Sequence, residues 1–386
     1  MISALRDTPW YPALLPFLLA CAVTCAAVPL SMWLARRVGA VDRPDAERRI
    51  HDEPTPRLGG IAMFAGFAVA LAVFGSGVEE RWDVVAVTAA ITVAMAVDDV
   101  LRLPAWTKLI IEMGAGILVA ALGITISFFG FRAHPASVFD LGLLAAPVTV
   151  VWLVGMQVSI NLLDGVDGVA SGVVAIVSGV LLLAAINRLG PTEGIENGIQ
   201  NGVIVMSGAL MGCCFGFLYW NVSPARVFMG DSGSHFLGVA VGTITVLGTA
   251  KVAVALTILI PLLSLGLPIG DTAFAIVRRR RAGTGIAAPD AGHLHHRLLA
   301  LGLSPRETAL AFYLATIVLG CIALGIFGHR KVLALAAVLL VVALVALVRR
   351  SRRRNGDLEG RPLRDWLLVS DREAVPSRTR RGGEAD

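Results

Sequence analysis

Long apolar runs, separated by short polar segments, dominate this sequence from end to end. A membrane hydrocarbon core of about 30 Å needs about 20 apolar residues in a helix. Eleven runs are long enough, or nearly so, and each predicts a transmembrane helix. The predicted spans are 11–35, 59–77, 83–98, 107–123, 141–160, 169–187, 201–219, 234–250, 252–277, 306–327 and 331–349. The third is short, and the break between the eighth and ninth depends on Lys251 alone.

The composition agrees with this pattern. Of the 386 residues, 56% are hydrophobic and only 16% are charged, which is unlike an ordinary soluble domain. We expect an all-α polytopic integral membrane protein, with residues 1–350 as the transmembrane domain. Residues 351–386 are charged and turn-rich, and we expect a basic, mostly disordered tail there. Residues 124–140 alternate and are rich in β-branched and aromatic side chains, which predicts a small hairpin.

The distribution of basic residues predicts the orientation in the membrane. With the N-terminus outside, 26 of the 33 lysines and arginines fall on the inner side, and the C-terminus is cytoplasmic. The first apolar run is long enough to span and is followed by Arg36 and Arg37, so we expect no cleavable signal peptide. The net charge of +5 therefore reflects topology and does not indicate nucleic-acid binding.

With this orientation, the chemically active side chains gather on the cytoplasmic side. The segments that carry them are VDDVLRLP, NLLDGVDG, VFMGDSGSHFLG and the loop after span nine. The candidate residues among them are five aspartates and three histidines, namely Asp98, Asp99, Asp164, Asp167, Asp231, His293, His295 and His296. Ionisable residues are costly near a bilayer, so such a group on one face indicates a functional site.

Each of these residues also has a purely structural explanation. Asp98 and Asp99 could mark a helix end meeting water, and the other aspartates could cap the helices that follow them. The run Arg278–Arg281 could stop a helix at the lipid headgroups. The histidines could be a chance cluster or a zinc site, although no cysteine lies nearby and the spacing is unsuitable. All these structural explanations would have to hold at once on one face of the protein, which argues against them.

Several carboxylates and an asparagine at helix ends suit a hard divalent cation, Mg²⁺ or alternatively Mn²⁺. Basic residues and helix N-termini beside such an ion suit a phosphate group. The combination is typical of phosphoryl transfer. The sequence contains no P-loop, HExxH, GxSxG or kinase motif, so we expect the nucleophile to come from a second substrate.

Six short motifs, in order, carry a family resemblance. They are PTPRLGG, DDVLRLPAWTKL, NLLDGVDG, VFMGDSGSHFLG, PIGDTAFAIVRR and HLHHRLL, and they extend over about residues 40–350. This set resembles the polyprenyl-phosphate N-acetylhexosamine-1-phosphate transferases. Members of that family are integral membrane enzymes that move a sugar-1-phosphate from a UDP-sugar to a lipid phosphate and release UMP. The resemblance makes residues 1–350 a catalytic domain.

The resemblance also implies roles for individual residues. Asp231 is implied as the direct Mg²⁺ ligand, with Asp164 as a second. The other residues implied as catalytic are Asp98, Asp99, Asp164, Asp167, His293, His295 and His296. Those implied in substrate binding are Lys108, Asn161, Arg278 and Arg279. Direct attack by the lipid phosphate is favoured, because a phosphate monoester is already largely ionised at pH 7. A covalent intermediate on a protein carboxylate is the alternative.

The form of the motifs favours one branch of the family. PTPRLGG and the interrupted HLHHRL resemble the branch that primes cell-envelope polysaccharides with GlcNAc-1-phosphate. We therefore expect UDP-GlcNAc and an undecaprenyl or decaprenyl phosphate as substrates, in a bacterial plasma membrane. The alternative within the family is UDP-MurNAc-pentapeptide, for peptidoglycan lipid I, or another UDP-amino sugar. The resemblance also suggests a homodimer. From a different class, a secondary transporter is the alternative, although transporter sites lie near the bilayer midplane.

Overall fold

The computed structural model describes residues 8–42, 54–129, 139–189, 195–249 and 302–326, with a few single positions between 266 and 299 and at 338. All helices described below belong to one compact unit that extends to Ala337. In the second unit, from Val338 to Asp386, only Val338 is described. The proposed division at residue 350 and the disorder of the tail therefore stay predictions.

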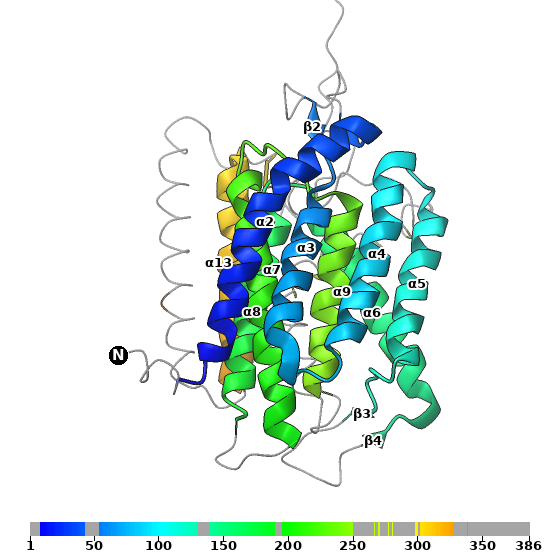
Figure 1. Ribbon diagram of the computed structural model, residues 1–386, viewed down its shortest axis with the longest axis vertical. Coiled ribbons are helices and arrows are strands. Elements are labelled where there is room, and N and C mark those ends of the chain that lie inside the picture. The colour runs from blue at the N-terminus through cyan, green and yellow to red at the C-terminus, as the bar shows by residue number, and fades with distance from the viewer. Residues whose placement is uncertain are drawn as a thin grey trace, which may run out of the picture. The chain divides into compact units, whose positions relative to one another are not determined.

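The described part is a bundle of helices, shown in Figure 1. The helices are α2 (Tyr11–Val38), α3 (Gly59–Phe74), α4 (Arg81–Leu101), α5 (Ala105–Ala121), α6 (Ala145–Leu163), α7 (Val169–Ile186), α8 (Ile195–Asn221), α9 (Gly230–Thr249) and α13 (Pro305–Ile326). Short 3₁₀ turns, η1 (Gly75–Gly77) and η3 (Gly142–Leu144), extend α3 and precede α6.

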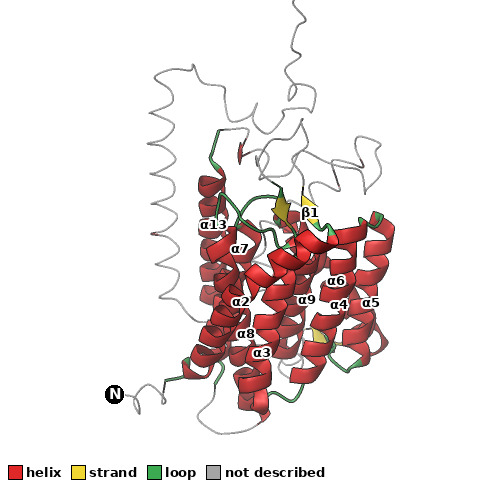
Figure 2. Ribbon diagram, turned by 45° about the horizontal axis from the view of Figure 1, so that its top comes forward, coloured by secondary structure: helices red, strands yellow, loops and turns green. Residues whose placement is uncertain are grey.

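Two short strand pairs lie at opposite ends of the bundle, as Figures 1 and 2 show. Strand β1 (Val41–Asp42) pairs antiparallel with β2 (Thr55–Pro56), close to the start of α3. Strand β3 (Phe128–Phe129) pairs antiparallel with β4 (Phe139–Asp140), at the other end. Residues 130–138, which would connect this second pair, are outside the described residues, so the predicted hairpin at 124–140 stays a prediction.

Seven helical segments in the described part are long and apolar enough to cross a membrane, so the chain is a multi-pass membrane protein. They are α2, α3 with η1, α4, η3 with α6, α7, α8 and α13. Helix α5 has 17 residues, and α9 begins with a polar turn. The ninth and eleventh predicted spans lie in largely undescribed segments, and the count of eleven and the orientation stay predictions.

Glycines bring α8 unusually close to α2. Gly208, Gly212 and Gly216 follow one another at intervals of four residues, so they share one face of α8. A Cβ atom on any of them would clash with the backbone of α2, at Ala13, Phe17 and Cys21 respectively. Small residues that allow such backbone contact are a common means of packing helices in membranes, where water does not drive association.

Helix α9 occupies the interior of the bundle. It contacts α3, α4, α5, α6, α7 and α8, and nearly all its described side chains are buried. Gly60 on α3 and Gly233 on α9 allow these two helices to touch through their backbones. A helix enclosed in this way can carry polar side chains, because its neighbours supply hydrogen-bond partners that lipid cannot. The polar first turn of α9 therefore lies where other helix ends surround it.

Candidate active site

Four helix ends from distant parts of the sequence meet at one end of the bundle. They are the C-terminal ends of α4 and α6 and the N-terminal ends of α5 and α9. This is the end that carries the β1–β2 pair, visible in Figure 2. The turn between α6 and α7, with the NLLDGVDG motif, lies at the same end. The folding of the chain thus brings together four of the six motifs found in the sequence.

Lys108 connects two of the predicted carboxylates. Its Nζ lies 2.6 Å from Asp98 Oδ2 and forms a second ion pair with Asp231 Oδ2. Asp231 Oδ1 accepts a hydrogen bond from Asn161 Nδ2 at 3.1 Å. The side chains of Asp98 and Asp231 are 2% and 14% exposed, and that of Lys108 is 29% exposed. A single half-buried cation is therefore shared by two carboxylates, one of which is buried and the other partly exposed.

Asp99 is adjacent to Asp98 in sequence but has a different task. Successive helix residues point about 100° apart, so the two carboxylates face different neighbours. The Asp99 oxygens accept hydrogen bonds from the backbone N–H groups of Asp231 and Ser232, at 2.8 and 3.0 Å. The first N–H groups of a helix have no partner within it and attract negative charge. Asp99 on α4 therefore caps α9 from another helix.

This capping shows that Asp231 does not cap its own helix through its side chain, which instead contacts Lys108 and Asn161. The capping alternative also fails for α7. That helix begins after Gly168 and has no side-chain cap. Asp167 instead accepts a hydrogen bond from the N–H of Ala225 at 3.0 Å, which ties the turn to the segment before α9.

Asp164 is the predicted carboxylate with the fewest restraints. Its side chain is half-buried and makes no hydrogen bond or ion pair with another described residue. Desolvation is the main cause that raises the pKa of the Asp164 carboxyl well above its usual range, and the negative charge of Asp231 adds to it. Arg57 lowers this pKa in part. Asp164 is thus available to bind a cation or a donor from a substrate.

The start of α3 and the segment before it pack against the residues that lead into α9. The N–H groups of Gly59 and Gly60 donate to the carbonyls of Phe228 and Met229, at 3.0 and 2.9 Å. Arg57 projects from this segment with its guanidinium 3.9 Å from Asp99 Oδ1. Arg57 belongs to the PTPRLGG motif, but it is not among the site residues predicted from the sequence. The structure adds it to the site as a half-buried cation.

Gly230 is required at the turn into α9. Its φ of +70° lies in the left-handed region, which costs a residue with a side chain energy. A Cβ atom there would also clash with the Arg57 carbonyl and the Asp99 carboxylate.

We therefore expect Gly230→Ala to destabilise the protein by about 1–3 kcal/mol and to displace Asp231. Thermal unfolding in detergent measures the first effect. Gly114→Ala is a suitable control, because Gly114 is helical and has open space around it. Equal midpoints for the two variants would contradict the steric argument.

The remaining predicted site residues lie outside the described residues. They are His293, His295, His296, Arg278 and Arg279. Their implied roles stay predictions.

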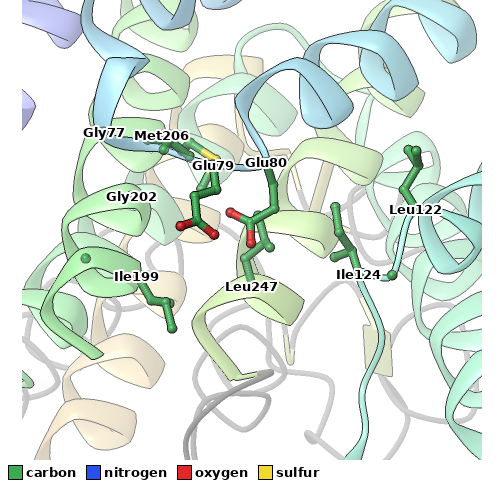
Figure 3. A pocket seen from close by; sticks show the side chains of 12 residues that line it. Gly77, Glu79, Glu80, Leu122, Ile124, Ile199, Gly202, Met206 and Leu247 are labelled. Carbon is green, nitrogen blue, oxygen red and sulfur yellow. The ribbon is translucent and has the colours of Figure 1, made fainter. Parts of the chain in front are cut away.

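A separate cavity of about 300 Å³ lies at the opposite end of the bundle. Glu79 and Glu80 point into it in Figure 3, beside Leu122, Ile124 and Met206. Glu80 precedes α4 and Asp98 lies in its last turn, so about 27 Å of helix separates them. This cavity is therefore distinct from the carboxylate site.

The donor set of the carboxylate site suits a hard cation. Within the described residues, no three His, Cys, Asp or Glu side chains could hold a metal ion by themselves. Mg²⁺, however, is usually held by one or two carboxylates, with waters and substrate phosphates completing its shell. Asp231 and Asp164 supply oxygens only, and Asn161 a further amide, which fits such an ion.

Comparison of the sequence with known proteins shows a family match and several similar enzymes. Residues 82–249 match Glycosyl transferase family 4. A probable undecaprenyl-phosphate N-acetylglucosaminyl 1-phosphate transferase of Bacillus subtilis is 38% identical over 287 residues, 74% of this chain and 77% of that protein. A decaprenyl-phosphate N-acetylglucosaminephosphotransferase of Mycolicibacterium smegmatis is 31% identical over 384 residues, 92% of this chain and 94% of that protein.

A phospho-N-acetylmuramoyl-pentapeptide-transferase from Synechococcus is 32% identical over 296 residues, 72% of this chain and 81% of that protein. The matched residues 82–249 include Asp98, Lys108, Asn161, Asp164 and Asp231, so the family match covers these five residues of the site, while Arg57 lies outside it.

Proposed function

Because this chain belongs to glycosyl transferase family 4, we propose that it transfers GlcNAc-1-phosphate from UDP-GlcNAc to a polyprenyl phosphate and releases UMP. Family membership confirms the resemblance seen in the six sequence motifs and makes the chain a phosphoglycosyl transferase. Among relatives that match more than 70% of this chain, identity reaches 38% for one named for N-acetylglucosamine transfer and 32% for one named for MurNAc-pentapeptide transfer, which favours UDP-GlcNAc. A pentapeptide transferase of Clostridioides difficile also reaches 38% identity, but over only 141 residues. The acceptor is an undecaprenyl or decaprenyl phosphate, as the names of the relatives suggest.

The observation that carries the proposal is the sharing of Lys108 between Asp98 and Asp231, beside the half-buried Asp164. Transfer of this kind brings two phosphate-bearing substrates together, and their negative charges repel each other. A site for them needs cations that can move between protein carboxylates and substrate oxygens. Lys108 and Arg57 are such cations, and the side chains of both are partly exposed.

In this proposal a divalent cation would bind beside these residues, with Asp231 and Asp164 as its protein ligands. When bound, Mg²⁺ supplies positive charge that neutralises the phosphate oxygens and the leaving UMP. Asn161 fixes the orientation of Asp231 through its hydrogen bond, and Asp99 fixes the helix turn that carries it. Asp98 keeps Lys108 in place before a substrate arrives. His293, His295, His296, Arg278 and Arg279 complete the site toward the sugar-phosphate in this proposal.

Bond formation needs no nucleophile from the protein. The lipid phosphate oxygen attacks the β-phosphorus of UDP-GlcNAc, the bond to the α-phosphate breaks, and UMP departs with the bridging oxygen. The phosphate of the acceptor is already ionised near pH 7. Since UDP-GlcNAc is made in the cytosol, the site faces the cytoplasm, with the N-terminus outside. The enzyme acts in a bacterial plasma membrane and primes cell-envelope polysaccharide synthesis. A homodimer is also part of this proposal.

The reaction can be tested with purified protein in detergent. We expect UMP release from UDP-GlcNAc with polyprenyl phosphate and Mg²⁺, and no release from UDP-MurNAc-pentapeptide. Addition of EDTA should abolish release, and Mg²⁺ or Mn²⁺ in excess should restore it. UMP release from UDP-MurNAc-pentapeptide alone would show that the proposed donor substrate is wrong, while the type of reaction would be confirmed. If a well-folded preparation released no UMP from any UDP-amino sugar, the proposed enzymatic function would be contradicted and the transporter alternative would be favoured.

A further inference from the structure

Beneath the candidate active site lies a second acid–base pair that the proposed chemistry does not use. Glu112 of α5 and His235 of α9 approach each other with Oε1 and Nε2 2.9 Å apart. The residues are 5% and 1% exposed, so the pair is enclosed by protein. Buried polar groups of this kind are expensive and persist only where they are well partnered. We refer to Glu112–His235 as the inner pair and to Lys108–Asp231 as the outer pair.

The inner and outer pairs connect the same two helices. Lys108 and Glu112 are four residues apart on α5, and Asp231 and His235 are four residues apart on α9. Four residues make about one turn, so each helix presents its two groups one above the other on one face. The order of acid and base is reversed between the pairs. Helix α5 contributes the base to the outer pair and the acid to the inner pair.

The His235 ring is also joined to the backbone of Asp231. Its Nδ1 lies 2.8 Å from the Asp231 carbonyl oxygen. A carbonyl oxygen only accepts, so Nδ1 carries the proton of this hydrogen bond. Nε2 is then left for the carboxyl group of Glu112. The ring thus forms a rigid bridge from α5 to the peptide group of the residue proposed to bind the metal.

We propose that the inner pair is a positioning device, which sets the register of α9 on α5 and so places the Asp231 carboxylate in the active site. This inference rests on the proposed function, because it assigns the pair to the same reaction. Glu112 and His235 act through Asp231 and touch no substrate.

The reversed order of charge gives the contact its register. If α9 slid by one turn in one direction, Lys108 would face His235, a base against a base. In the other direction, Glu112 would face Asp231, an acid against an acid. Either slide would also leave one buried group unpaired, which is costly. A fixed register is the best-attested use of buried polar pairs.

The outer pair cannot set the register by itself during turnover. Lys108 is 29% exposed, and the cations and phosphates of the reaction compete for both it and Asp231. The inner pair is shielded from them, so it can keep the two helices in place when the outer pair opens. Groups behind a metal ligand commonly change metal affinity or activity by about 10–100-fold when removed.

Three variants separate a positioning role from a merely structural one. Glu112→Leu and His235→Leu each leave one buried polar group without its partner, so we expect a lower unfolding temperature. The double variant removes both groups and should recover most of that stability, because replacing a buried pair by apolar residues is often neutral. Thr245→Val serves as a control, since it removes a buried hydroxyl from α9 further from Asp231.

The deciding measurement is Mn²⁺ affinity of the detergent-purified protein, followed by electron paramagnetic resonance, together with kcat and KM for UMP release. We expect the double variant to bind Mn²⁺ about tenfold or more weakly and to lose kcat, despite its recovered stability. Glu112→Gln keeps a hydrogen-bond partner for Nε2, since its amide can donate or accept, and this variant should stay near the wild type. A double variant that regains both stability and Mn²⁺ affinity would overturn the positioning role. A third outcome separates the two proposals. If the wild type released no UMP but the variants still bound Mn²⁺ more weakly than it does, the positioning role would be supported and the proposed function overturned.

Discussion

Asp231→Asn is expected to remove UMP release while the protein stays folded. The substitution keeps the shape of the side chain and an oxygen that can accept from Asn161. It removes the negative charge that pairs with Lys108 and that we propose binds the cation. Lys108 keeps Asp98 as a partner, so the substitution leaves no buried charge unpaired. We expect turnover to fall on the order of a thousandfold or more, as for loss of a major electrostatic contact.

The measurement is the rate of UMP release at saturating UDP-GlcNAc, with thermal unfolding of the same preparation. Glu80→Gln is a matched control, because it removes one negative charge at the opposite end of α4 and lines the separate cavity in Figure 3. That control should release UMP at the wild-type rate. An Asp231→Asn enzyme that keeps more than half of its turnover would remove this residue from the reaction.

Asp99→Ala is expected to damage the fold as well as the activity. The Asp99 side chain is fully buried and accepts two hydrogen bonds at the start of α9. Alanine would leave the N–H groups of Asp231 and Ser232 unpaired and would remove one of the two carboxylates that lie 3.9 Å from the Arg57 guanidinium. Breaking a buried charged contact from one side typically costs about 3–5 kcal/mol. A lower unfolding temperature should therefore accompany the loss of turnover.

Unfolding temperatures of two Asp99 variants test the role of this residue in capping α9. Asp99→Asn keeps one acceptor oxygen, so its unfolding temperature should lie between those of the wild type and Asp99→Ala. Asp83→Ala, in the first turn of the same helix, is the control and should change little. If Asp99→Ala unfolded at the wild-type temperature, the capping of α9 by Asp99 would not be a major source of stability.

Much of the helical architecture could be predicted from local sequence pattern. Apolar runs of sufficient length predicted α2, α3, α4, α6, α7, α8 and α13, and these form the seven membrane-spanning candidates of the described part. The bounds differ by a few residues. The third run was placed at 83–98, whereas α4 continues to Leu101, so that Asp98 and Asp99 lie within its last turn. The motifs, recognised in order, also predicted the family correctly.

The division of labour between neighbouring polar residues could not be predicted in this way. Asp98 and Asp99 are adjacent in the chain, and the sequence motif implies the same role for both. Their helix turns one toward Lys108 and the other toward the start of α9. His235 and Glu112 were not selected as site residues. His235 lies within the VFMGDSGSHFLG motif but had no implied role, and Glu112 is a single polar residue within an apolar run. Only their meeting, across 123 positions of sequence, shows that they form a pair.

The sequence by itself therefore determined that the chain enters the membrane many times, which apolar segments are helical, and in which order the motifs of the family occur. Those properties depend on the length and polarity of local segments, which the order of residues states directly. The tertiary structure decided that α9 is enclosed by six other helices, that Asp99 caps it, and that Lys108 connects Asp98 with Asp231. These contacts join residues far apart in sequence, and they arise only when helix packing fixes the rotation and register of each helix against its neighbours.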